Sequence, residues 1–148
     1  VEFGATAGVA AASTADVAAR VLELTQGRGA DQVFVAVGAK PAIEQGFVLA
    51  ATGGAVVLVG MAADGVTVDL DPTALASRSQ RILGSKMGSG RLAVDIPVLV
   101  DLYRAGRLRL DELVSRPYSL AEIDEAMAAV RRGEARRNVI VFDTPDAQ

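Results

Sequence analysis

The chain has 148 residues, of which 51% are hydrophobic and 22% charged, with a net charge of −3; this predicts one globular, soluble unit with a packed core. A pI near 4.9 and 4% aromatic residues argue against a nucleic-acid-binding protein, which needs a basic surface with interleaved aromatics. No apolar run approaches the roughly 20 residues that span a bilayer and no basic-then-apolar leader opens the chain, so we expect no membrane segment and a cytoplasmic location.

Two residue types that carry much of protein chemistry are missing. The sequence contains no cysteine, which excludes disulfides, and no histidine. Because these are the usual ligands of zinc, the chain by itself cannot build a Cys/His metal site. The sequence also argues against a serine hydrolase, since no histidine is present to act as the base.

The chain opens with a strand followed by a helix. "TAGVAA" (6–11) is a weak strand, and Ser13 or Thr14 can cap a helix that ends at Gly27. The apolar stripe of this helix is Val17, Val21 and Leu24.

The same order of strand and helix then repeats, with clearer sequence patterns. "QVFVAVG" (32–38) is a strand, and Pro41 suits the first turn of the helix that follows. A turn at Gly53-Gly54 ends that helix and leads into "AVVLVG" (55–60). After a polar loop comes a short alternating segment at 66–70 and a further strand over 81–86.

The fold class follows from this alternation. An uninterrupted Val/Leu run such as 55–60 suits a central parallel strand that helices cover on both faces. Alternating strands and helices imply right-handed βαβ units. We therefore predict an α/β fold with part of a doubly wound parallel sheet over residues 1–86.

Residues 87–148 have a different rhythm and are expected to contribute to a second domain. Asp95 can cap a helix that ends at Gly106, with Ile96, Leu99 and Tyr103 on one face. "SLAE" (119–122) has the spacing of a capping box and predicts a helix that ends at Gly133. The segment "NVIVF" (138–142) is a final strand.

Two predicted strands end in glycine, at Gly38 and Gly60. Ligands of doubly wound sheets bind beyond the carboxyl ends of the strands, where a glycine allows close approach. The simpler interpretation is that the chain merely turns there. The pattern alone leaves both interpretations open.

Several motifs in order carry a family resemblance. They are "EFGATAG", "GADQVFVAVG", "GGAVVLVGM", "RILGSKMGS", "DIPVLVDLYRAGRLRLDELVSRPYSLAEIDEAM" and "GEARRNVIVF". Together they resemble the carboxyl-terminal portion of zinc-dependent medium-chain alcohol dehydrogenases, closest to the class III, formaldehyde dehydrogenase-like type. The resemblance implies a partial Rossmann-type NAD-binding domain over 1–86 and a catalytic-domain segment over 87–148.

Other features of these enzymes lie before the residues that this chain resembles. Such enzymes place a GxGxxG loop, an acidic residue for the adenosine ribose and a Cys/His/Cys zinc site before the point that matches Val1. The similar "GSGRLA" (88–93) is interpreted as a decoy, because the family register puts it after the last strand of the sheet. The zinc ligands implied for the parent enzyme are therefore absent from this chain.

The resemblance implies two groups of contacts with the nicotinamide half of the cofactor. Val59 and Gly60 match the strand end beside the nicotinamide ring. Ser85 and Met87 match positions whose backbone groups bind its carboxamide.

Further contacts are implied for the rest of the cofactor. Val37 and Gly38 match the strand end near the adenosine ribose. Arg137 matches an arginine that pairs with the pyrophosphate, a role suited to its forked donors. Lys86 is either a second anion contact or a surface lysine.

The implied activity of the parent enzyme is hydride transfer between a small alcohol or aldehyde and NAD with the help of zinc. The isolated chain would then be inactive. One alternative is a noncatalytic, dimerising truncation product, and another is part of a zinc-free quinone reductase. Relatives dimerise near 66–70 and 81–86, so a homo-oligomer is expected.

Overall fold

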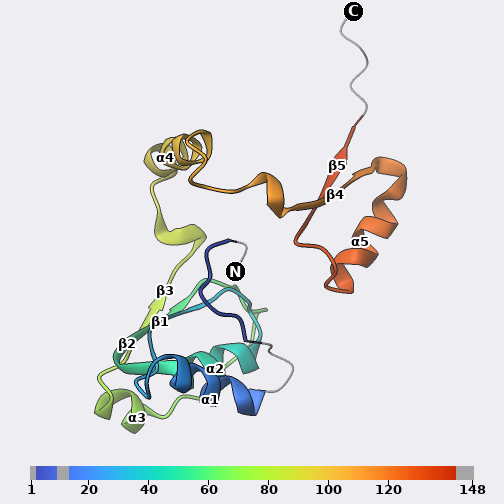
Figure 1. Ribbon diagram of the computed structural model, residues 1–148. Coiled ribbons are helices and arrows are strands. Elements are labelled where there is room, and N and C mark those ends of the chain that lie inside the picture. Colours follow the sequence, from blue (N-terminus) through green and yellow to red (C-terminus); the bar gives the residue numbers. More distant parts are fainter. Residues whose placement is uncertain (1–2, 10–13, 143–148) are drawn as a thin grey trace, which may run out of the picture. The chain divides into compact units, whose positions relative to one another are not determined.

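The computed structural model describes residues 3–9 and 14–142. The chain forms two compact units, Val1–Gly90 and Arg91–Gln148. The predicted α/β class is confirmed, because parallel strands alternate with helices (Figure 1).

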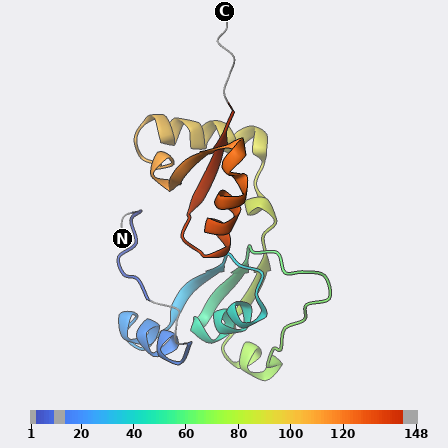
Figure 2. The same cartoon turned by 90° about the vertical axis from the view of Figure 1, so that its right-hand side faces the viewer.

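The first unit is built around a three-stranded parallel sheet in the order β1-β2-β3. Its strands are β1 (Ala30–Val35), β2 (Ala50–Leu58) and β3 (Arg81–Gly84). Its helices are α1 (Thr14–Leu24), α2 (Lys40–Leu49) and α3 (Pro72–Ser77). Helix α2 packs on β1 and β2, and α1 lies beside α2 (Figure 2).

The core of this unit lies between α2 and the sheet. Val35, Ile43, Ala50 and Val56 are buried together, and Val56 is only 1% exposed. The run at 55–58 thus supplies the central strand of the described sheet, as predicted. Helix α2 covers only one face of it, and Val57 on the other face is partly exposed, so the predicted cover on both faces is not seen among the described residues. The strand assigned as β2 nevertheless starts at Ala50, directly after α2.

The Gly53-Gly54 turn lies inside the assigned β2 and does not end α2, so this boundary prediction is wrong. Ala30 pairs with Ala50, but Gln32 pairs with Ala55. The turn therefore lies where the register shifts between these two pairs. Gly53 has a φ of 75°, which glycine adopts without strain. Helix α2 ends earlier because Ala50 is already extended, with ψ near 138°.

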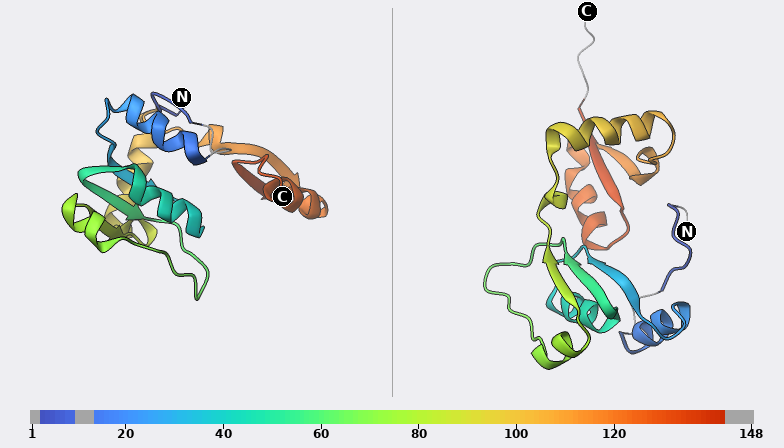
Figure 3. Two further views of the ribbon diagram at one scale, coloured as in Figure 1. Left: turned by 90° about the horizontal axis from the view of Figure 1, so that it is seen from below. Right: turned by 90° about the vertical axis from the view of Figure 1, so that its left-hand side faces the viewer.

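Other boundaries in the first unit also differ from the predictions. Residues 6–9 of "TAGVAA" form no strand, and the rest of that segment lies outside the described residues. The alternating segment 66–70 is not a strand; it belongs to a long loop that leaves the sheet after β2 and returns at α3 (Figure 3). Strand β1 ends at Val35 and β3 at Gly84.

The sheet carries an exposed apolar row on the face opposite the core. Phe34 pairs with Val57, and Val57 pairs with Leu83, so the three residues lie side by side across the sheet. Side chains alternate along a strand, which directs this row away from Val33 and Val35. Phe34 is 65% exposed and Leu83 is 47% exposed.

The second unit pairs two parallel strands and packs one helix against them. They are β4 (Val114–Ser119), β5 (Arg137–Val141) and α5 (Ile123–Arg131), with Tyr118, Ala126 and Ala129 buried. The amide of Asn138 donates to the Ala126 carbonyl at 2.8 Å and ties β5 to α5. Strand β4 was not predicted, because "VSRPYS" has no apolar alternation and contains proline.

The predicted capping box at 119–122 is confirmed. One Glu122 carboxylate oxygen accepts hydrogen bonds from the Ser119 backbone N–H and from its hydroxyl, both at 2.9 Å. A single 3₁₀ turn, Leu120–Glu122, precedes α5.

The helix expected from Asp95 begins one turn earlier. Helix α4 runs over Leu92–Arg104 with Arg91 at its N-cap, and the Asp95 carboxylate accepts the Arg91 N–H at 2.6 Å. Asp95 therefore caps the helix from within its first turn. The described part of the second unit leaves α4 exposed on nearly every side.

Candidate functional site

The carboxyl ends of β2 and β3 border a hollow of about 450 Å³. Because parallel strands end at the same edge of a sheet, residues distant in sequence meet there. The hollow is lined by Leu58, Val59, Gly60, Met61, Gly84, Ser85, Lys86 and Ser89. It thus brings together three of the predicted site residues, Val59, Gly60 and Ser85, with Lys86 beside them.

Val37 and Gly38, from the end of β1, lie directly against the same edge. A Cβ atom added to Gly60 would stand 2.6 Å from the Cα of Val37, and one added to Gly38 would stand 2.7 Å from the Cα of Ala62. Neither glycine has a positive φ. The two loops are therefore interlocked backbone to backbone, and it is this close approach, not a turn, that requires glycine at both positions.

Hydrogen bonds hold the hollow's two walls in place. The N–H groups of Val59 and Gly60 both donate to the Val35 carbonyl, at 3.0 and 2.9 Å. The Ser85 N–H donates to the Leu58 carbonyl at 2.9 Å. The ends of all three strands are thus linked by backbone bonds, so the site's framework is preorganised by the sheet.

A left-handed turn closes the hollow after β3. Met87, Gly88 and Ser89 all have positive φ, and the Ser89 N–H donates to the Lys86 carbonyl at 2.9 Å. Met87, a predicted site residue, is 75% exposed and does not line the hollow. The side chains of Ser85 and Ser89 are close, with their hydroxyl oxygens 3.5 Å apart.

Arg137, the remaining predicted residue, belongs to the second unit and begins β5. Within the described residues its guanidinium makes no hydrogen bond or ion pair, and its backbone N–H lies 3.4 Å from the Ser115 hydroxyl. The neighbouring Arg136 instead donates through its guanidinium to the Glu112 carbonyl at 3.3 Å. The two adjacent arginines thus differ in their contacts, and the guanidinium of Arg137 is available to bind an anion.

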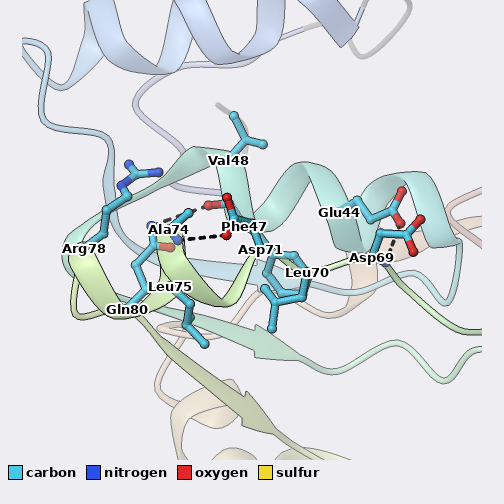
Figure 4. A pocket seen from close by; sticks show the side chains of 10 residues that line it. All are labelled: Glu44, Phe47, Val48, Asp69, Leu70, Asp71, Ala74, Leu75, Arg78 and Gln80. Carbon is cyan, nitrogen blue, oxygen red and sulfur yellow. Dashed lines mark hydrogen bonds between the residues drawn. The ribbon is translucent and has the colours of Figure 1, made fainter.

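A second hollow, of about 330 Å³, lies between α2 and α3 (Figure 4). On one side Lys40 pairs with Asp69 at 2.9 Å and with Glu44 at 3.4 Å. The hydrogen bond with Asp69, more than any other contact, raises the pKa of Lys40. Sequence reasoning missed this hollow, because α3 and its N-cap Asp71 were not predicted.

The polar groups on the other side of this second hollow also have hydrogen-bond partners. Gln80 and Arg78 each donate to the Ala50 carbonyl at 2.8 Å, just beyond the end of α2. Asp71 accepts the N–H groups of Thr73 and Ala74. Since these polar groups have partners within the unit, we interpret them as structural.

Neither unit offers a metal site within the described residues, where no group of three or more His, Cys, Asp or Glu side chains could hold a metal ion. The whole sequence has no Cys or His, so the residues present do not fit zinc. Among the described helices, none is long and apolar enough to cross a membrane.

Comparison with known proteins agrees with these features. The chain is 38% identical over 143 residues to the NDMA-dependent alcohol dehydrogenase of Amycolatopsis methanolica, and 40% identical over 146 residues to the putative alcohol dehydrogenase D of Mycobacterium tuberculosis. Each match covers 95% of this chain and 38% of the relative, so the chain spans little more than a third of their length.

A solved structure and a family model extend this comparison. The benzyl alcohol dehydrogenase of Acinetobacter calcoaceticus superposes with a TM-score of 0.78 at 30% identity, over 84% of this chain and 34% of that one. The family model described as zinc-binding dehydrogenase matches residues 1–104. The chain therefore belongs to the zinc-binding dehydrogenase family.

Proposed function

We propose that the full-length protein containing this chain transfers a hydride between a small alcohol or aldehyde and NAD. The observation that carries the proposal is the hollow at the carboxyl ends of β2 and β3, which collects Val59, Gly60 and Ser85 where a parallel sheet binds its ligand. The alcohol dehydrogenase relatives support the reaction class. They do not favour the quinone reductase or noncatalytic alternatives.

In this proposal the first unit is part of the NAD-binding domain and forms one wall of the nicotinamide site. Val59 and Gly60 lie beside the ring. Ser85 and Met87 bind the carboxamide through backbone groups. Because the Ser85 N–H is already bonded to Leu58, Ser85 would use its carbonyl oxygen. NAD, when bound, accepts or supplies the hydride.

The remaining contacts bind the other half of the cofactor. Val37 and Gly38 lie near the adenosine ribose, in a wall that the interlocked loops make rigid. Arg137, in the catalytic-domain segment, pairs with the pyrophosphate, since its guanidinium is exposed and has no other partner in the described residues.

Any zinc in the parent enzyme would be held by residues outside this chain. We therefore expect the chain, expressed by itself, to retain no stoichiometric zinc and to have no dehydrogenase activity. Metal analysis after dialysis tests this. One tightly held zinc per chain would contradict it.

We further propose the class III, formaldehyde dehydrogenase-like subtype, on the motif from Asp95 to Met127. A homo-oligomer is proposed through the segment 66–70 and the outer edge of β3, which has no strand partner among the described residues. Gel filtration with light scattering of the full-length protein tests the assembly. A cytoplasmic location stays a prediction of the sequence, which cell fractionation tests.

The central experiment measures NAD binding and turnover by the full-length protein. Arg137→Gln should weaken NAD about tenfold or more, because a charge-assisted hydrogen bond contributes roughly 1.5–3 kcal/mol and each 1.4 kcal/mol is tenfold. Arg131→Gln, which removes an exposed arginine from α5, is the matched control. Equal affinities of the two variants would contradict the role of Arg137, and failure to reduce NAD with any alcohol would contradict the proposed reaction.

A further inference from the structure

The two lysines of the sequence are in opposite electrostatic environments. Lys40 is half-buried and paired with two carboxylates. Lys86 is exposed and makes no ion pair or side-chain hydrogen bond with any described residue, although it lines the hollow at the carboxyl ends of β2 and β3. None of the residues lining that hollow is acidic. The hollow therefore has one uncompensated positive charge.

The backbone around Lys86 is held on both sides. The Ser85 N–H is bonded to Leu58 and the Lys86 carbonyl accepts from Ser89, so the lysine extends from a fixed anchor. Its own backbone is extended, with φ of −91° and ψ of 122°. The main chain thus sets where the lysine starts, while the long side chain is left to reach a ligand.

The rest of the lining suggests what kind of ligand is complementary. Leu58, Val59 and Met61 provide an apolar wall. Ser85 and Ser89, whose hydroxyl oxygens are 3.5 Å apart, line the same hollow as Lys86. An ammonium and two hydroxyls can surround one oxyanion with hydrogen-bond donors. A molecule with an apolar body and a single anionic end matches this arrangement.

We propose that Lys86 binds the carboxylate of an alcohol or aldehyde substrate and so selects substrates that carry a negative charge. This inference rests on the proposed dehydrogenase function, because it places the substrate at the same hollow. A carboxylate is favoured over a phosphate monoester because the single positive charge in the lining balances the single negative charge of a carboxylate, whereas a phosphate monoester carries a charge of about −1.5 to −2 at pH 7. Lys86 would be a specificity residue.

The test compares a hydroxy acid with its uncharged primary amide of equal length as substrates of the full-length protein. The wild-type protein should prefer the acid. K86Q should lower the acid-to-amide ratio of kcat/KM about tenfold. This effect is smaller than for a buried charge pair, because solvent screens the exposed lysine. K86R should retain most of the preference, and K86E should reverse it. Higher salt should reduce the preference of the wild-type protein for the acid over the amide.

R28Q is the matched control, because it removes one exposed positive charge from the amino end of β1 in the same unit. It should leave the ratio unchanged. A ratio that K86Q does not alter, or that R28Q alters equally, would overturn the proposal. A stronger preference for the corresponding phosphate monoester would overturn the assignment to carboxylates.

Failure of the proposed function is distinguishable from failure of this inference. If no alcohol is oxidised, the dehydrogenase proposal fails, and calorimetry with the hydroxy acid then tests Lys86 directly. Binding that K86Q abolishes and R28Q preserves supports the anion site. Equal heats for the wild type and K86Q overturn it.

Discussion

Gly38 and Gly60 show how single residues determine the geometry of the candidate site. Each lies where the neighbouring loop's backbone occupies the space of a side chain. Sequence patterns suggested either a ligand or a turn as the reason for these glycines. The structure gives a third reason, which still serves the site, because the interlocked loops fix the ends of β1 and β2 relative to each other.

Replacing Gly38 by alanine should destabilise the first unit by at least about 2 kcal/mol, because the new methyl group meets backbone that cannot rotate away. Gly84→Ala is the control: this glycine also ends a strand, but nothing lies within 4 Å of an added Cβ. It should change the unfolding free energy by less than about 0.5 kcal/mol. Urea unfolding at fixed protein concentration measures both, and similar losses for the two variants would refute the interlocking.

At the scale of elements, the capping box at 119–122 proved more dependable than the predicted strand boundaries or the predicted cap at Asp95. The capping box at 119–122 formed as predicted, since its two partners are three residues apart. The ends of α2 and β2 differed from prediction, because side chains from far along the sequence hold them. Gln80 and Arg78 both reach the carbonyl of Ala50, about thirty residues away.

Gln80→Leu should destabilise the first unit by about 1 kcal/mol, because it removes one of the hydrogen bonds donated to the carbonyl of Ala50, a fully buried residue. Gln80→Glu should cost more, since a carboxylate oxygen would face the carbonyl oxygen. Gln45→Leu, the same substitution elsewhere in the unit, is the control and should change stability by less than about 0.5 kcal/mol. If Gln45→Leu costs as much as Gln80→Leu in urea unfolding, the capping role is wrong.

The start of α5 should be sensitive to acid. Hydrogen bonds from the Ser119 backbone and hydroxyl, helped by the nearby Arg116, lower the pKa of Glu122. A carboxyl whose pKa is lower in the folded state stabilises that state fully above its unfolded value of about 4.3. This contribution is lost as the pH falls through the lower, folded pKa.

An NMR titration of the Glu122 carboxyl carbon should therefore have its midpoint below about 4.3, and Ser119→Ala should move it upward. In Glu122→Gln the corresponding acid-induced loss of helix should disappear. A Glu122 midpoint at or above the ordinary value would show that the capping box does not persist in solution.

For the whole molecule, exposed apolar surface is the dominant feature. Among the described residues β1 has β2 as its sole strand partner, and Phe34, Val57 and Leu83 form a row on the open face of the sheet. Pairing of the segment "TAGVAA" (6–11) with β1 would cover the open edge of the sheet. Residues 6–9 form no strand, so that solution is not adopted in the described part of the segment.

The chain expressed by itself should accordingly self-associate, because an open strand edge and an apolar row recruit other strands. Light scattering across a dilution series measures this, with hydrogen exchange on Val33–Val37 as the local probe. Phe34→Glu should weaken association, whereas Leu22→Glu, at an exposed position on α1, should not. A monomer at every concentration, with those amides exchanging freely, would contradict the prediction.

The sequence by itself determined the features that depend on neighbouring residues and on family motifs: the α/β class, the apolar central strand β2, the capping box and the family. Only the tertiary structure decided which of two lysines is paired, why Gly38 and Gly60 must be glycines, and which residues share the hollow. These properties depend on contacts between segments separated by twenty or more residues. Periodicity and spacing report the local conformation of a chain, whereas close approach and charge pairing arise only when distant segments pack together.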